Sequence, residues 1–259
     1  MFSFAHKGRL PAVLAGLLIA ASSLCSAAQA TPTIVLFKTE ALPIPGYPGT
    51  GDLLGAGAVI RGEGAISGSE YGGSPAPLVG AKIYTPPGMQ VHPQGFVTCA
   101  PSLLEQSGPA VCPSRSIAGP KGSASGVVSF GGERVGETAS VQLFFGPGGG
   151  LSAFVDGTTP VSLEIVARAR LVGSAPPPFG LEFIGEVPLI ETVPGALDAS
   201  FIRGSVTVGA AYRQGKHTIS YLTLPKTCSK GGWPVKIELD FLGGAVAEAS
   251  YTMPCPKKR

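Results

Sequence analysis

The 259-residue sequence contains no asparagine. This absence excludes N-linked glycosylation, because the acceptor motif begins with that residue. It also excludes the Asn-Gly turns that many β-hairpins use, so that glycine must supply the positive φ angles of tight turns. The chain has 38 glycines and 25 prolines, and this composition favours a protein with many turns.

Charged residues are also scarce, at 14% of the chain, which is about half the usual share. The formal net charge is +3, but two of the basic residues, Lys7 and Arg9, lie in a segment that we expect to be removed. The remaining 17 basic and 16 acidic side chains give a net charge of +1. Because a nucleic-acid surface needs clustered lysine and arginine, we expect no nucleic-acid partner.

The N-terminal segment has the pattern of an export signal. Lys7 and Arg9 precede an apolar stretch, Leu10–Leu24, which is too short to span a membrane. The motif Ala28–Ala30 then has small residues at the two positions that signal peptidase reads. The sequence therefore predicts a signal peptide over residues 1–30, cleaved near Ala30.

Cys25 leaves an alternative, because a lipoprotein signal also places a cysteine at its cleavage point. Such a signal needs a small residue before the cysteine, whereas Leu24 is large, so cleavage near Ala30 is favoured. No second apolar segment has the pattern of a transmembrane anchor. We expect a protein that is secreted or held in the cell envelope.

Four cysteines follow the export signal, which is an even number in an oxidising compartment and predicts two disulfides. Three pairings are possible, and sequence proximity favours Cys99–Cys112 and Cys228–Cys255. A short helix starting at Pro101 and ending at Gly108 would bring the first pair together. A metal or redox site is the weaker interpretation, because the sequence has no CxxC motif and the nearest histidine, His92, stands alone.

Alternating apolar and polar residues predict an all-β fold. Residues 161–172 alternate with period two, which is typical of a half-buried antiparallel strand. Near the C-terminus, residues 235–241 and 245–251 predict a hairpin. A turn over residues 242–244 pairs Phe241 with Ala245 and keeps apolar residues opposite one another, whereas a two-residue turn would place Leu239 opposite a charge.

Three successive prolines in Ser174–Pro178 cannot lie in a central strand and suggest a domain boundary. We predict antiparallel β-sandwiches, one large or two small, of immunoglobulin-like or jelly-roll-like type. The predicted domains are residues 31–173, with Cys99 and Cys112, and residues 179–256, with Cys228 and Cys255.

Motifs that carry chemistry are missing. The chain has no GxSxG, SxxK, GxGxxG or P-loop pattern. His92 and His217 belong to no metal-binding or catalytic spacing, and no carboxylate pair is marked out for glycoside hydrolysis. We therefore predict no catalytic residue, no metal and no cofactor.

The single tryptophan, Trp233, is the candidate binding residue. It follows Gly231 and Gly232 in a loop close to Cys228. An exposed ring there could stack on a sugar or a partner protein. The ring could equally plug an open end of the β fold, and this second interpretation is favoured.

Several segments together resemble an uncharacterised family of exported β-rich proteins from high-GC actinobacteria. They are Pro77–Cys99, Leu103–Ala124 and Pro225–Phe241, with a closing Cys255. The shared frame is a Cys, twelve residues, Cys-Pro, and a terminal Cys, and it covers most of the chain after the signal. The resemblance implies export, two disulfides and β structure, and it carries over no catalytic residue.

These observations favour a non-enzymatic extracellular or cell-envelope protein with a binding or structural role. Candidate partners are cell-wall polysaccharide and an envelope protein. A carrier that holds an apolar ligand, such as a lipid, inside the β fold is the alternative, and apolar residues on nominally outer faces, such as Val166 and Leu242, would support it. A secreted hydrolase that uses His92 or His217 with a carboxylate is the third hypothesis.

Overall fold

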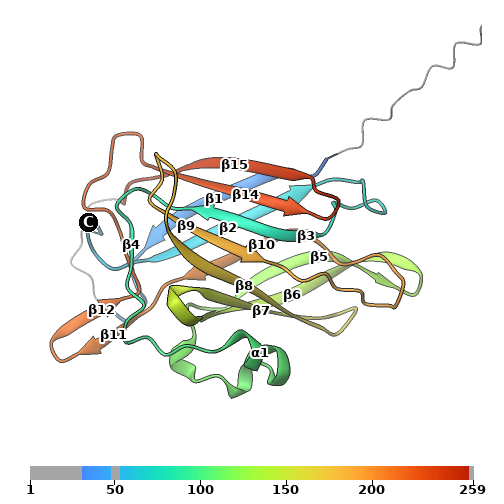
Figure 1. Ribbon diagram of the computed structural model, residues 1–259, viewed down its shortest axis with the longest axis horizontal. Helices are drawn as coiled ribbons and strands as arrows, with labels where there is room; N and C mark the ends of the chain where they lie inside the picture. Colours follow the sequence, from blue (N-terminus) through green and yellow to red (C-terminus); the bar gives the residue numbers. More distant parts are fainter. Residues whose placement is uncertain (1–30, 48–52, 257–259) are drawn as a thin grey trace, which may run out of the picture.

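The computed structural model describes residues 31–47 and 53–256, and it confirms the all-β class (Figure 1). One antiparallel sheet of eleven strands curls into a nearly barrel-shaped layer. The predicted signal peptide, residues 1–30, and Cys25 within it lie outside the described residues. In sheet order the strands are β1 (Thr33–Leu42), β2 (Val59–Ser67), β10 (Ser200–Val208), β5 (Gly122–Phe130), β6 (Glu133–Phe145), β7 (Leu151–Thr159), β8 (Leu163–Ser174), β9 (Leu181–Glu186), β3 (Leu78–Tyr84), β14 (Trp233–Phe241) and β15 (Val246–Met253).

Smaller elements complete the chain. Two short sheets pair β11 (Ala211–Gln214) with β12 (His217–Ser220), and β13 (Leu222–Thr223) with β4 (Gln90–Val91). The helical elements are α1 (Pro101–Ser107) and three single 3-10 turns, η1 (Pro109–Val111), η2 (Ser114–Ser116) and η3 (Pro147–Gly149). No helix in the described ranges is long and apolar enough to cross a membrane.

Strands from both sides of Ser174–Pro178 belong to the same large sheet. β10 lies between β2 and β5, and β3 lies between β9 and β14. Hydrogen bonds therefore run through all eleven strands, and the facing layers of the fold are opposite sides of one curled sheet. The division into domains at residues 174–178 stays a prediction.

The C-terminal hairpin has the predicted register. The amide of Phe241 donates to the carbonyl of Ala245 at 2.9 Å, and Gly243 and Gly244 take φ angles of 87° and 84° in the turn. The opposed pairs beyond the turn are Leu239–Ala247, Ile237–Ala249 and Val235–Tyr251. At these positions Leu239 and Ile237 each face an alanine, and Val235 faces a tyrosine.

Both predicted cysteine pairs lie at disulfide distance. The Cα atoms are 5.5 Å apart for Cys99–Cys112 and 5.9 Å apart for Cys228–Cys255. Helix α1 occupies the predicted residues between the first pair, and Gly108 ends it by donating its amide to the Leu104 carbonyl. Leu104 is fully buried against the outer face of the sheet.

The two edge strands, β1 and β15, lie beside each other and nearly close the sheet. Because eleven successive antiparallel strands alternate in direction, the first and the last must run parallel. No backbone ladder joins these two strands, which are both fully described. Side chains bridge them instead, with the rings of Phe37 and Tyr251 6.4 Å apart in an edge-to-face contact.

Inside the sheet, the buried residues form three separate clusters instead of one continuous core. Two lie toward the end that carries β4, β11 and β12, and are centred on Trp233 and on Tyr221. Burial raises the pKa of Tyr221, whose hydroxyl donates to the Gly149 carbonyl at 2.7 Å. The third cluster is at the opposite end and is centred on Phe241. A fourth cluster lies outside the sheet, under α1.

Candidate functional site

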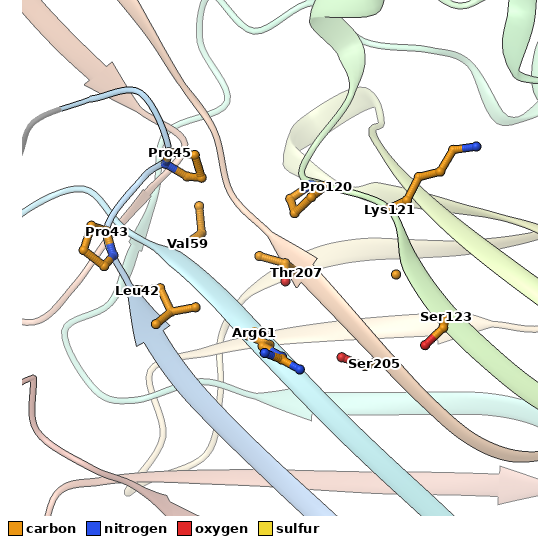
Figure 2. Close-up of a pocket in the computed structure, with 11 residues that line it drawn as sticks. Leu42, Pro43, Pro45, Val59, Arg61, Pro120, Lys121, Ser123, Ser205 and Thr207 are labelled. Carbon is orange, nitrogen blue, oxygen red and sulfur yellow. The ribbon is translucent and has the colours of Figure 1, made fainter.

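A groove crosses the outer face of β2, β10 and β5, and Figure 2 shows its lining. It has a volume of about 500 Å³, which is within the usual range for small-ligand sites. Prolines and Lys121 stand at its margins, and short polar side chains form its floor. The lining residues are Leu42, Pro43, Pro45, Val59, Arg61, Pro120, Lys121, Gly122, Ser123, Ser205 and Thr207.

Strand register brings the floor residues together. Arg61 on β2 is opposite Thr207 on β10, and Ser205 on β10 is opposite Ser123 on β5. Directly opposed residues share one face of a sheet, so all four side chains lie on the outer face. A Cβ at Gly122 would come within 2.1 Å of the Ser205 carbonyl, so this glycine permits the close approach of β5 to β10.

The charge of the groove is largely neutralised. Arg61 pairs with Glu63 at 2.7 Å and with Glu40 at 4.0 Å, and its side chain is about half exposed. Lys121 is exposed at the rim. An ion pair of this exposure contributes little to stability, and its effect here is to remove the net positive charge that an anion would need.

Three hydroxyl groups on the groove floor have no hydrogen-bond partner in the described part of the protein. They belong to Ser123, Ser205 and Thr207, and Ser205 lies between the other two in the sheet. Each hydroxyl can donate one hydrogen bond and accept others. The floor therefore offers neutral, adaptable hydrogen-bonding groups between rigid proline walls.

Trp233 does not contribute to this groove. Its ring is 3% exposed, and its Nε1 donates to the Thr227 carbonyl at 2.9 Å. It packs with Val235 and Met253 in the cluster at one end of the sheet. This placement agrees with the plug interpretation and leaves no free ring face for stacking on a surface ligand.

The two histidines are placed in different small elements. His92 follows β4 and is half-buried, whereas His217 begins β12 and is exposed. Within residues 31–47 and 53–256, no three His, Cys, Asp or Glu side chains form a group that could hold a metal ion. The hydrolase hypothesis stays a prediction.

Sequence reasoning missed the groove. Residues 59–67 and 200–208 each contain alternating apolar and polar residues, which could have indicated that Arg61, Ser205 and Thr207 face outward. The sequence does not reveal that β10 pairs with β2, because about 140 residues separate them. No family model, curated protein or solved structure matches the chain.

Proposed function

We propose that this is an exported, non-enzymatic binding protein that holds a segment of neutral polysaccharide in the groove between β1, β2, β10 and β5. The observation that carries this proposal is the row of hydroxyls of Ser123, Ser205 and Thr207, which have no hydrogen-bond partner among residues 31–47 and 53–256. The two cysteine pairs at disulfide distance fit an oxidising, extracellular compartment.

A hydroxyl-rich chain is the ligand that the groove matches best. Sugar hydroxyls both donate and accept, as do those of serine and threonine. The proline margins are rigid, so that little conformational entropy is lost when a ligand binds. The neutralised Arg61 can still donate hydrogen bonds from a half-exposed guanidinium without selecting for anions.

Binding is favoured over hydrolysis by the composition of the site. Glycoside hydrolysis uses two carboxyl groups that flank the scissile bond. None of the described residues that line the groove has a carboxyl group, and the nearby Glu40 and Glu63 are engaged with Arg61. The groove is therefore proposed as a docking site for a chain that stays intact.

A sedimentation assay tests the proposal. The purified protein is spun with insoluble cell wall and with several neutral polysaccharides, over salt concentrations from about 50 to 200 mM. We expect pelleting that does not depend on salt, and a loss of affinity of roughly tenfold in Ser205→Ala/Thr207→Ala, because two hydrogen bonds are removed.

Thr218→Ala is the matched control, because Thr218 is an exposed strand residue of β12 that does not line the groove. It should pellet like the parent protein. Absence of pelleting on every material, or equal pelleting by the control and the double variant, would reject the groove as a polysaccharide site.

A further inference from the structure

The inward-facing side of the large sheet is a second candidate site. Its orientation follows from the register around the sheet. Ile83 on β3 is opposite Phe183 on β9 and Ile237 on β14. Ile237 packs with the Phe241 cluster, which joins β14 and β3 to β2 and β10 across the interior. Ile83 therefore points into the curled sheet.

Part of the middle of this inner side is accessible to solvent although it is apolar, whereas Phe183, opposite Ile83, is 8% exposed. Ile83 is 42% exposed, and Ile165, Ala167 and Ile237 are half-buried. These residues lie between the clusters that close the two ends. We call them, with the inward glycines Gly62 and Gly185, the inner surface.

Small side chains explain why the interior is not filled. A closed sheet of about eight strands is just wide enough for its side chains to fill, and the width grows with strand number. Eleven strands thus need larger inward residues, yet Gly62, Gly185 and Ala167 lie here. A Cβ placed on Gly62 would meet no heavy atom within 4 Å.

The charge of the interior restricts what it can hold. Among the described inward positions of the large sheet, two are charged: Glu133, which is exposed at the end of β6, and Glu137, which is 4% exposed. The two carboxylate oxygens of Glu137 accept the backbone amides of Thr159 and Val161 at 2.9 and 3.0 Å. The Glu137 carboxylate is therefore already satisfied, and none of the described inward positions of the sheet offers a cation to an anionic ligand.

One inward polar atom is left unsatisfied. Thr39 is directly opposite Gly62 in the β1–β2 ladder. Its hydroxyl is buried and has no hydrogen-bond partner in the described part of the chain, while the residue as a whole is only half-buried. Rotation about χ1 exchanges the hydroxyl and methyl positions of a threonine, so a ligand beside Gly62 can supply the missing partner.

We propose that the inner surface binds a neutral lipid with a hydrocarbon chain and a single hydroxyl group, and that Thr39 hydrogen-bonds to that hydroxyl. The chain displaces water from Ile83, Ile165 and Ile237, which is favourable because apolar area is removed from solvent. A fatty-acid carboxylate is disfavoured, because it would lose its hydration without gaining a cation. This site is separate from the polysaccharide groove, which is on the opposite face of the sheet.

The experiment compares three ligands of equal chain length, namely dodecane, dodecan-1-ol and dodecanoate. The full chain is stripped of bound lipid with organic solvent, refolded under oxidising conditions and titrated by calorimetry. We expect the alcohol to bind about 3- to 10-fold more tightly than the alkane, which is the usual effect of one hydrogen bond, and the carboxylate to bind more weakly than either.

Two variants locate the site. Ala167→Leu fills the inner surface and should weaken binding of the alcohol and the alkane at least tenfold, while Arg170→Leu, on the outer side of the same strand, should bind both like the parent. Thr39→Val preserves shape and should reduce alcohol binding to the level of the alkane. Thr218→Val is the control for that change.

Failure of both the alkane and the alcohol to bind would overturn the inner site, whatever the outcome of the sedimentation assay. Equal loss of binding in Ala167→Leu and Arg170→Leu would also overturn it. If dodecan-1-ol binds Thr39→Val as tightly as it binds the parent, Thr39 does not hydrogen-bond to the alcohol, and that part of the proposal is wrong.

Discussion

Under helix α1, the outer face of strands β7 and β8 holds more deeply buried side chains than the inner face, although Glu164, Arg168 and Arg170 elsewhere on the outer face of β8 are exposed. On the outer face, Phe154 and Val166 are 4% and 7% exposed, because helix α1 covers them. On the inner face, Ala153, Ile165 and Ala167 are half-buried. In most curled sheets the interior is the packed side, and at this place under α1 the order is reversed.

The outer cluster stabilises these strands, and the inner face is left accessible. Leu104 of α1 and Phe144 of β6 complete the packing around Phe154 and Val166, and Cys99–Cys112 holds the helix in place. The packing of α1 on the outer face thus stabilises β7 and β8. The residues on their inner face can therefore stay small and accessible.

The largest effect is expected where the outer cluster is broken. Phe144 is 2% exposed under α1, and Phe144→Ala should lower the free energy of unfolding by about 3–5 kcal/mol. Urea unfolding, followed by tyrosine fluorescence and circular dichroism, measures this change. A loss below about 1 kcal/mol would show that the outer cluster contributes little, and the comparison of the two faces would fail.

Removal of the disulfide under α1 should have the next largest effect. Replacing Cys99 and Cys112 with alanine should cost about 3 kcal/mol, given the short loop that the pair closes. The backbone amides of α1 should then exchange with solvent much faster. Replacement of Cys228 and Cys255 is the control, because it should lower stability and leave the exchange of α1 amides slower than in the first variant. Equal exchange in both variants would contradict the role given to Cys99–Cys112.

Alanine substitutions at two inward glycines should change the free energy of unfolding by smaller amounts, and in opposite directions. Gly62→Ala has open space at the new Cβ and should leave stability unchanged or raise it by about 0.4–1 kcal/mol, since alanine restricts the unfolded chain. Gly126→Ala would place its Cβ 2.5 Å from the Ser200 carbonyl, and should cost about 1–3 kcal/mol. Thermal unfolding of the two variants measures the difference. A similar loss in both would show that the interior around Gly62 is packed.

Local features of this fold were predictable from the sequence. The register of the C-terminal hairpin follows from the alternation around Phe241 and Ala245, because a slip of one residue would place charges inside. Helix α1 follows from Pro101 and Gly108, which suit the first position and the end of a helix. These signals are confined to a few neighbouring residues.

Long-range placement was not predictable. Because Val166 alternates with inward residues, the sequence predicts that it lies on the outer face. The sequence does not show that α1, about sixty residues earlier in the chain, covers it there. Its apolar character is therefore explained by the helix and gives no support to a lipid carrier. Leu242 is half-buried in the hairpin turn, where its amide donates to the Pro77 carbonyl at 2.9 Å.

The candidate sites depend on the same long-range information. The groove needs β10 to lie between β2 and β5, and the inner surface needs the sheet to curl until β1 meets β15. The sequence of β2 contains Gly62 and Gly64, so it indicates a strand only weakly. Only the ladder shows that Gly62 faces inward, opposite Thr39.

The most direct test of the contrast between the two faces uses adjacent residues of β8. Urea unfolding of lipid-free protein compares Val166→Ala, on the outer face, with Ile165→Ala, on the inner face. Val166→Ala should cost about 2 kcal/mol, whereas Ile165→Ala should cost less than about 1 kcal/mol although it removes one more carbon atom. If Ile165→Ala costs as much as Val166→Ala or more, the inner face is packed and the proposed lipid site does not exist.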